Sequence, residues 1–593
     1  MNRILWVLVV LMVMLPVMAQ AKLTLAKGGD TCYTIVIAPD ASPAVHQAAS
    51  EFVSDMKRMT GAVFPVANSA VVGPKIFIGP GAALSASFPG LLLHKLPPEG
   101  FIIRTRGTDL ALAGHDDRGT LYAVYTFLEE HLGVRWYAPD ATTLPKHRVV
   151  KIPALNEKQF PAFAYRNTDE HLVSESAAWD AHLKLDGMSV PDDPNYGGVN
   201  RLFNGAENFY ELVPPSVYFA THPEYFSMIN GQRRDSGDSQ LCLTNPDVLR
   251  IVTDKLVAQA RQDPKLLTLG FSPNDADDGN CQCDLCKASD AKYGAPSGTL
   301  IAFVNKLAAA VQAKLPGRKI WIETLAYEYT EKPPTPGTIE PASNVLICFA
   351  PINMSFSHSI AADPVNKSVR DNLLNWNKVA PGHLQVWHYV TNFANYLQPF
   401  PDWDELGADM AYYHENGVSG VFCEGNSEAV GEMMEMRTWV IAHLLWNPKQ
   451  NIWSLVQDFC KGYYGAAGSS IYQYLRLLQE QLRRPNIHLT IWDSPNAPYL
   501  SPAMLKKANQ LFNRAEAAVK SHPVELSRVQ EARMGIRYVE LMRGIPSAHS
   551  DQAAKDAFHT LLTQFTQDLR RFHMNYIGGG KSVSDWLAAI QKP

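Results

Sequence analysis

The feature that most constrains the fold is a repeated order of short apolar strand, polar loop and amphipathic helix that begins near residue 160. Strands that alternate with helices usually pair in parallel, and eight of them over about 270 residues are typical of a (β/α)8 barrel. We therefore predict an α/β fold whose central part, residues 160–470, is a (β/α)8 TIM barrel. The eight predicted strands are 163–166, 201–203, 240–243, 267–271, 319–325, 344–350, 383–390 and 418–423.

The regions on either side of the barrel predict two further domains. Residues 22–159 mix apolar strand patterns with two amphipathic helices, at 44–60 and 121–132, which indicates a small α+β accessory domain. Beyond the barrel the apolar residues recur mainly at helical spacing, so residues 471–593 are predicted to form an α-helical C-terminal domain.

The first 21 residues predict a signal peptide. Arg3 supplies a positive charge, residues 4–18 are almost continuously apolar, and Ala19-Gln20-Ala21 has the small-x-small pattern of a cleavage site. A membrane anchor is the alternative, but the apolar run is short for a span of about 20 residues. We predict export to the periplasm or the exterior, with no membrane span once the signal is removed.

The charge of the chain constrains its partners. The formal net charge of −5 is mildly acidic, whereas a nucleic-acid-binding domain would carry a basic face. The 12 Trp, 23 Tyr and 24 Phe residues could stack on sugar rings, although a large core also uses aromatic side chains. We expect a glycan or glycoprotein partner and no nucleic acid; the sequence does not indicate an oligomeric state.

The chemistry is expected where the fourth strand ends, in the stretch LTLGFSPNDADDGNCQCDLC at 267–286. Pro273 stops the strand, and Asn274 and Asp275 follow at the carboxyl end, where α/β barrels place catalytic groups. Glu323 lies near the end of the fifth strand and Glu424 just beyond the eighth. Each carboxylate also has a structural alternative: a cap for Asp275, a buried ion pair for Glu323 and a surface loop for Glu424.

Carboxylates at one end of a barrel are typical of glycosidases. Such enzymes need an acid that protonates the leaving oxygen and a group that stabilises an oxocarbenium-like centre, either a carboxylate or the acetamido group of the substrate. We predict Glu323 as the general acid/base, Asp275 as the stabilising or orienting group and Glu424 as a further catalytic candidate. Aromatic and polar side chains predicted to contact the sugar are Asn274, Tyr327, Trp387, His388 and Tyr389.

Four of the eight cysteines, Cys242, Cys281, Cys283 and Cys286, belong to the third and fourth strand ends. Disulfides, free thiols and a four-thiolate zinc site all remain open, although structural zinc sites usually have two C-x-x-C pairs. We predict at least one disulfide in this group, because the ends of adjacent strands lie close together. No cofactor and no catalytic metal are predicted.

Two parts of the sequence resemble known families. The run GHDDRGTLYAVYTFLEEHLGVRWYAPD at 114–140 resembles the N-terminal domain that precedes the barrel in family 20 hexosaminidases and family 67 α-glucuronidases. That resemblance implies an accessory domain without catalytic residues. The motifs QLCLTNPDV, SPND, CQCDLC, PSGTLIAFVNKLA, IETLAYEYTEKPP, YVTNFANYLQPFP and MRTWVIAHLLWNP resemble exported bacterial proteins with a DUF4838 domain, which include glycoside hydrolase family 163.

Family 163 enzymes are endo-β-N-acetylglucosaminidases that act on complex N-glycans, so the resemblance implies this activity. It also implies that Asn392 and Glu435 line the active face with Asn274, Asp275, Glu323 and Tyr327. The chain departs from the common pattern at Ala206-Glu207-Asn208-Phe209, at His388 and at Cys423-Glu424.

Our leading hypothesis is therefore a retaining glycoside hydrolase that cleaves N-acetylglucosamine-containing glycans. An α-glucuronidase-like hydrolase is the second hypothesis, and it would need basic residues that hold a uronate carboxylate. The third is a carbohydrate-binding protein without catalysis on the same barrel, which would bind glycan without turnover.

Overall fold

The computed structural model describes residues 22–69, 71–187, 190–199, 206–484, 486–547 and 550–590. The predicted signal peptide lies outside these residues. The chain divides into two compact units, and the first contains the described residues up to Gly133 together with Leu144–Gln159. The second contains Val134–Thr143 and everything from Phe160 onward, so the predicted boundary at residue 470 lies inside it. Of the described helices, none has the length and apolar character that crossing a membrane requires.

The first unit combines a six-stranded sheet with an amphipathic helix. Helix α1 (Pro43–Thr60) begins at Ser42, whose side chain accepts a hydrogen bond from the Val45 amide, and ends at Gly61 with φ 81°. This is the left-handed conformation that glycine adopts without strain. Helix α3 (Asp117–Thr126) contacts α1 and the strands, and the unit thus combines a mixed sheet with helices. The sheet order is β10 (Asn156–Gln159), β5 (Phe101–Arg106), β6 (Asp109–Gly114), β4 (Lys75–Ile78), β2 (Thr34–Val36) and β3 (Val66–Ala67), and β1 (Leu23–Lys27) pairs separately with β9 (Val149–Ile152).

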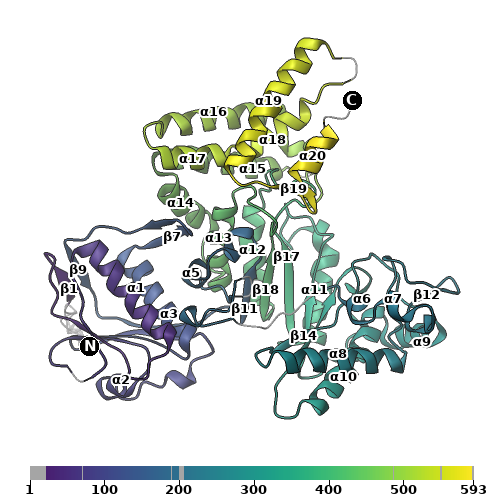
Figure 1. The fold of residues 1–593 in the computed structure, drawn as a ribbon, viewed down its shortest axis with the longest axis horizontal. Helices are drawn as coiled ribbons and strands as arrows, with labels where there is room; N and C mark the ends of the chain where they lie inside the picture. The colour runs from purple at the N-terminus through teal and green to yellow at the C-terminus, as the bar shows by residue number, and fades with distance from the viewer. Residues whose placement is uncertain are drawn as a thin grey trace, which may run out of the picture. The chain divides into compact units, whose positions relative to one another are not determined.

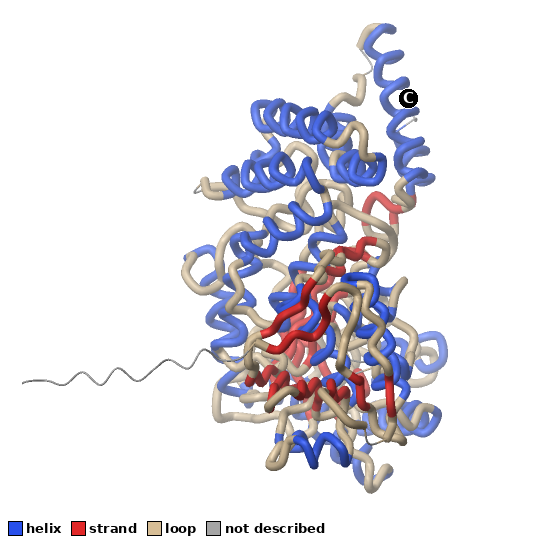
Figure 2. The backbone as a smooth tube through the Cα atoms, turned by 90° about the vertical axis from the view of Figure 1, so that its left-hand side faces the viewer, coloured by secondary structure: helices blue, strands red, loops and turns tan. Residues whose placement is uncertain are grey.

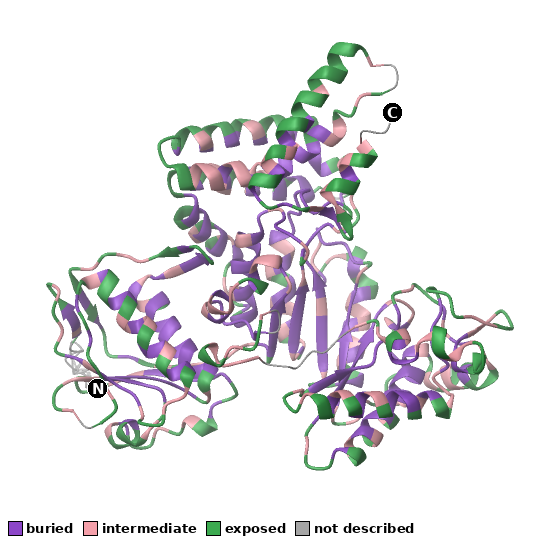
Figure 3. Ribbon diagram, in the orientation of Figure 1, coloured by how far each residue is buried: buried purple, intermediate pink, exposed green. Residues whose placement is uncertain are grey.

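The second unit contains a six-stranded parallel sheet, which is buried almost throughout (Figures 1 and 3). Parallel sheets are usually covered on both faces, so their strands are mostly apolar throughout. The apolar runs of these strands agree with this. The order across the sheet is β11 (Tyr165–Thr168), β18 (Gly420–Glu424), β17 (Leu384–Tyr389), β16 (Val345–Phe349), β15 (Trp321–Ala326) and β14 (Thr268–Gly270). It corresponds to predicted strands one, eight, seven, six, five and four, which form a half-barrel.

The other half of the predicted barrel differs from the prediction. Predicted strand 201–203 lies outside the described residues, and 240–243 forms only an isolated bridge between Phe226 and Leu241. The reason is visible at Gln240, whose side chain donates to the Asn274 carbonyl and accepts from the Asn274 amide, at 3.1 and 2.9 Å. A side chain here takes the bonds that a strand backbone would otherwise make. Two short strands, β12 (Met228–Ile229) and β13 (Gln232–Arg233), form a hairpin in this region.

Helices connect the parallel strands, and their starts follow local sequence rules. Helix α8 (Pro246–Gln262) has proline in its first turn and Asn245 as its cap, whose side chain accepts from the amides of Asp247 and Val248. The longer connecting helices are α10 (Pro296–Lys314), α11 (Lys367–Val379), α12 (Trp403–Glu415) and α13 (Met434–Trp446). The shorter ones are α4 (His171–Ser174), α5 (Ala177–His182), α6 (Phe209–Leu212), α7 (Pro215–Tyr218) and α9 (Asp284–Tyr293).

The C-terminal part of the second unit is mostly helical (Figure 2). Its helices are α14 (Ile452–Tyr463), α15 (Gly468–Leu482), α16 (Pro502–Ala518), α17 (Pro523–Ala532), α18 (Met534–Arg543), α19 (Gln552–Arg571) and α20 (Val583–Ile590).

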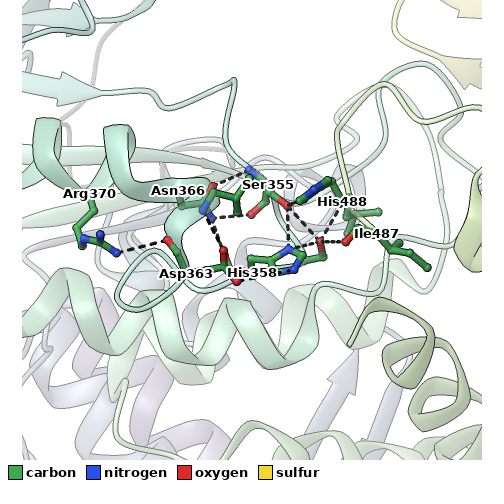
Figure 4. A network of polar contacts seen from close by, with 10 residues as sticks. Ser355, His358, Asp363, Asn366, Arg370, Ile487 and His488 are labelled. Carbon is green, nitrogen blue, oxygen red and sulfur yellow. Dashed lines mark hydrogen bonds and ion pairs between the residues drawn. The ribbon is translucent and has the colours of Figure 1, made fainter. Parts of the chain in front are cut away.

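A polar network joins this helical part to the loop that follows β16 (Figure 4). Ser357 Oγ donates to the Ile487 carbonyl at 3.1 Å and accepts from the Leu489 amide at 3.0 Å. Ser357 Oγ also lies 2.8 Å from His358 Nδ1, and Asn366 donates to the Ser355 carbonyl at 2.9 Å. These groups bond to one another across the two segments, so the network fastens the 487–489 segment to the sheet.

Candidate active site

Strand register places several of the predicted residues on one face of the parallel sheet. Residues paired across parallel strands point the same way, and alternate residues of one strand share a face. Tyr389 pairs with Glu424, and two residues earlier Trp387 pairs with Phe422. Tyr327, just beyond β15, packs in the same small apolar cluster as Trp387 and Ala206. Strands β15, β17 and β18 therefore bring Tyr327, Trp387, Tyr389 and Glu424 to one end of the sheet.

Glu424 has the environment of a protonated acid. The Trp387 indole donates to Glu424 Oε2 at 2.7 Å, which fixes the orientation of the carboxyl group. Burial and then the nearby Asp169 carboxylate raise the pKa of Glu424 to about 8, with weaker contributions from Glu207 and Asp275. Because both effects disfavour the charged form, Glu424 holds a proton at neutral pH.

The turn after β18 explains the residues around Glu424. The Gly425 amide donates to Asp169 at 2.7 Å and the Asn426 amide donates to Glu170 at 3.1 Å. A Cβ at position 425 would lie 2.3 Å from the Glu170 carboxyl carbon, so any larger residue would have to displace the buried Glu170 side chain. Burial raises the pKa of Asp169 to about 6 and that of Glu170 to about 8.

Asp275 is exposed to solvent in the loop that follows β14. The Tyr327 hydroxyl donates to Asp275 Oδ1 at 2.9 Å, so the carboxylate is held by the residue that follows the neighbouring strand β15. Burial and this carboxylate raise the pKa of Tyr327 well above its usual value, and the phenol stays a proton donor. Asp275 is therefore an oriented hydrogen-bond acceptor on a loop outside the sheet.

Glu207 was noted only as a departure from a family pattern, yet the structure brings it to the same place. Its side chain is partly exposed and its backbone has φ 55°, a conformation uncommon for a residue with a Cβ. Partial burial and then the Asp275 carboxylate raise the pKa of Glu207 to about 7. Asp169 was also missed, although it lies three residues beyond the predicted strand 163–166 and directly after β11, and this position could have indicated it. We call the seven residues at this end the rim cluster: Asp169, Glu207, Asp275, Tyr327, Trp387, Tyr389 and Glu424.

Asn274 positions the loop side of the rim cluster, by which we mean Glu207 and Asp275. Its Oδ1 accepts from the Tyr210 amide at 3.1 Å and its Nδ2 donates to the Ser239 carbonyl at 2.9 Å. Asn208 makes a similar tie, because its side chain donates to the Gly270 carbonyl and accepts from the Ser272 amide. These two amide side chains bind the segments that carry Glu207 and Asp275 to the end of β14.

Glu323 occupies a different place from the one predicted. It is the third residue of the six-residue strand β15 and its side chain is fully buried. Burial raises the pKa values of Tyr165 on β11 and Cys348 on β16, and the nearby Glu323 carboxylate raises them further, with Asp186 also acting on Tyr165. Alternation puts Glu323 on the face that carries Leu325 and Tyr327, but two steps deeper than Tyr327. Its assignment as the general acid/base stays a prediction.

Three other predicted sugar-binding residues contact groups that do not belong to the rim cluster. His388 is on the opposite face of β17 from Trp387, where its Nδ1 lies 3.1 Å from the Tyr413 hydroxyl; burial lowers its pKa to about 3. Asn392 donates to the Asp493 carbonyl at 2.8 Å and holds the C-terminal segment. Glu435 accepts from the Tyr463 hydroxyl at 3.3 Å and lines a separate cavity with Asp140, Arg528 and Glu531.

The predicted disulfide among the four clustered cysteines is not formed, and none of the eight cysteines, all of which lie among the described residues, is disulfide-bonded. Instead, the sulfur atoms of Cys242, Cys281, Cys283 and Cys286 all lie within 4.8 Å of one another. The prediction from strand adjacency was therefore right about proximity and wrong about the bond.

Two family models match the sequence. The model described as "Domain of unknown function (DUF4838)" covers residues 136–476, and the model of the glycosyl hydrolase family 67 N-terminus covers residues 23–127. The chain belongs to the DUF4838 family. No curated protein matches it significantly.

Solved structures similar to this DUF4838 protein include glycoside hydrolases. A family GH115 4-O-methyl-α-glucuronidase with specificity for decorated arabinogalactans is 12% identical, with a TM-score of 0.57 over 92% of this chain and 77% of its own. A GH138 enzyme that targets pectin rhamnogalacturonan II is 10% identical, covers 94% and 98%, and has a TM-score of 0.49. A mutant β-hexosaminidase from Streptomyces plicatus is 12% identical, covers 77% and 92%, and has a TM-score of 0.42. The first similarity concerns the fold alone: the DUF4838 protein and the GH115 enzyme have similar folds.

Proposed function

We propose that this DUF4838 protein is a glycoside hydrolase that cleaves N-acetylglucosamine-containing glycans, as an endo-β-N-acetylglucosaminidase on N-glycans with retention. The observation that carries the proposal is the rim cluster, which combines a protonated Glu424, an oriented Asp275 and aromatic side chains. The resemblance to family 163 in the same part of the chain supports the choice of substrate.

Glu424 is the general acid in this proposal. With a pKa of about 8 it holds its proton at neutral pH and can deliver it to the glycosidic oxygen as the C–O bond breaks. The Trp387 indole, which donates to Glu424 Oε2, directs the carboxyl group during this transfer. After proton transfer the carboxylate accepts a proton from water in the second half of the reaction.

Asp275 stabilises the reacting centre together with Tyr327. The carboxylate can accept the N–H of the substrate's acetamido group, so that the acetamido oxygen attacks the anomeric carbon as the leaving group departs. Water then opens the cyclic oxazolinium ion from the opposite face, and two displacements give net retention. The Tyr327 hydroxyl, 2.9 Å from Asp275 Oδ1, orients the carboxylate for this role.

A uronic acid substrate is the second candidate, because the family 67 N-terminal model and the GH115 structure both point toward glucuronidases. The charges of the rim cluster favour a neutral sugar. The charged groups that act most strongly on Glu424, namely Asp169, Glu207 and Asp275, are acidic and would repel a uronate carboxylate. We therefore rank N-acetylglucosamine glycans ahead of uronides.

Digestion of an N-glycoprotein followed by mass spectrometry of both products tests the proposal. We expect cleavage between the two core N-acetylglucosamine residues, and proton NMR of the fresh product should show the β-anomer first. Aryl α-glucuronides serve as the parallel substrate, and turnover of these alone would replace the proposal with the second candidate. Glycan binding without turnover of either substrate would instead support a non-catalytic carbohydrate-binding protein.

A further inference from the structure

Four cysteine side chains from two distant segments meet beside the loop that carries Asp275. Cys242 follows the isolated bridge at Leu241, whereas Cys281, Cys283 and Cys286 belong to the loop after β14 and the first turn of α9. The Cys242 sulfur lies 3.8 Å from the sulfurs of both Cys283 and Cys286, and all four sulfurs lie within 4.8 Å of one another. We call these four residues the thiol cluster.

The spacing of these sulfurs matches a tetrahedral metal site. Zinc–thiolate bonds of about 2.3 Å with tetrahedral angles separate the ligand sulfurs by about 3.8 Å. A disulfide would instead bring two sulfurs to about 2.05 Å and leave the other pair without a role. Because all four sulfurs already lie within 4.8 Å of one another, one ion can bond all of them, and the geometry favours a metal over a disulfide.

Hydrogen-bond donors around the thiol cluster suit thiolates rather than neutral thiols. The Met228 amide and the Arg233 guanidinium donate to Cys281 Sγ at 3.4 and 3.5 Å. The Thr244 hydroxyl lies 3.2 Å from Cys286 Sγ and 3.6 Å from Cys242 Sγ. Four thiolates and one divalent cation carry a net charge of −2, which these donors and the arginine charge offset.

We propose that Cys242, Cys281, Cys283 and Cys286 bind one structural zinc ion that fastens the loop after β14 to the segment after residue 240. Four thiolates in tetrahedral arrangement select zinc over harder divalent cations such as calcium and magnesium. With four protein ligands the ion has no open position, so its role is to hold the loop and not to activate water. The same loop carries Asn274 and Asp275, so the ion positions the loop side of the rim cluster.

Metal analysis of the full-length protein tests the site independently of any glycosidase activity. We expect about one zinc per chain after dialysis, four sulfurs at about 2.3 Å in X-ray absorption, and release of the ion when the thiols are modified. Cobalt substitution should give the intense visible bands of a tetrahedral thiolate site. Iron in place of zinc, or a chain that retains no metal when reduced and supplied with zinc, would overturn the assignment.

Variants separate the thiol cluster from the other cysteines. Cys286→Ser should lose bound zinc, whereas Cys32→Ser, on an exposed residue, and Cys460→Ser, on a buried residue elsewhere, should keep it. If Cys286→Ser does not fold, Thr244→Val keeps all four sulfurs and removes only a donor to them; we expect it to weaken zinc binding about tenfold. A disulfide between any two cluster cysteines in non-reduced peptides from the zinc-supplied protein would disprove the proposal.

Discussion

The rim cluster has two sides that are built differently. Its sheet side lies on paired parallel strands and consists of Trp387, Tyr389 and Glu424. Its loop side lies on segments outside the sheet and consists of Glu207 and Asp275. Backbone hydrogen bonds between β17 and β18 fix the first group in register. The second group is held by the side chains of Asn208, Asn274 and Gln240. The two sides therefore differ in what a single substitution can disturb: on the sheet side it removes a functional group, and on the loop side it can also displace the loop.

The largest effect is expected on the sheet side, from Glu424→Gln. The amide keeps the shape but cannot deliver a proton, so turnover of the natural glycan should fall by about 10²–10⁴-fold. The loss should shrink on an aryl glycoside, whose leaving group needs little protonation. Glu415→Gln, an exposed substitution on α12, is the control and should be neutral. Near-normal turnover by the Glu424→Gln enzyme would remove Glu424 from the mechanism.

On the loop side, Asp275→Asn should lower turnover by about 10²-fold on both types of leaving group. Stabilising the reacting centre does not depend on the leaving group, so the two substrates should respond alike. Tyr327→Phe removes the 2.9 Å bond to Asp275 and should cost about tenfold, through orientation alone. A loss confined to the poorer leaving group would make Asp275 the acid and reverse the two roles.

Asn274→Ala tests whether side chains hold the loop side. The substitution removes the bonds to the Tyr210 amide and the Ser239 carbonyl, so we expect about 1–3 kcal/mol less stability and lower activity. Asn280→Ala in the same loop removes a single 3.4 Å contact to Asp290 and is the matched control. Urea unfolding and initial rates of both variants distinguish them; equal effects would mean that these bonds do not position Asp275.

Glu323→Gln tests whether Glu323, rather than Glu424, is the general acid. Glu323 is fully buried two steps below Tyr327, so we expect turnover within about threefold of the parent enzyme, with any effect falling on stability. Steady-state rates measured beside those of Glu424→Gln decide between the two glutamates. A hundredfold loss in Glu323→Gln with an active Glu424→Gln would restore the assignment made from the sequence.

The pH dependence gives the smallest expected effects. Glu424 should act as an acid below its pKa of about 8 and lose this role as the pH rises through that value, which gives the pH–rate profile its basic limb. Glu170 and Asp409 also have folded-state pKa values of about 8, above those of the unfolded chain. Their stabilising contribution is complete below the unfolded pKa of about 4 and is lost as the pH rises through 8. Urea unfolding should therefore show lower stability at pH 9 than at pH 6, and Asp409→Asn should reduce that difference.

Much of the sheet side could be predicted from the sequence, because strand signals are local. The predicted strand 267–271 appears as Thr268–Gly270, and predicted 383–390 appears as Leu384–Tyr389. Alternation along 383–390 also contained a signal that the prediction did not use. Trp387 and His388 are neighbours in sequence and must point to opposite faces of a strand, so both could not contact one substrate.

How deeply each candidate residue is buried, and which residues it contacts, depend on the tertiary structure alone. Two glutamates close to strand ends look alike in sequence, but the neighbours of each strand leave Glu424 half-buried beside Asp169 and enclose Glu323 completely. The sequence by itself determined which chemical groups follow the strands: Asn274 and Asp275 after β14, and Glu424 at the end of β18. That Glu207 joins them and that four sulfurs gather around one point depends on loops folded across long sequence separations. Local residue patterns carry no information about such contacts. The geometry of these contacts is set by packing between segments that are distant in the chain.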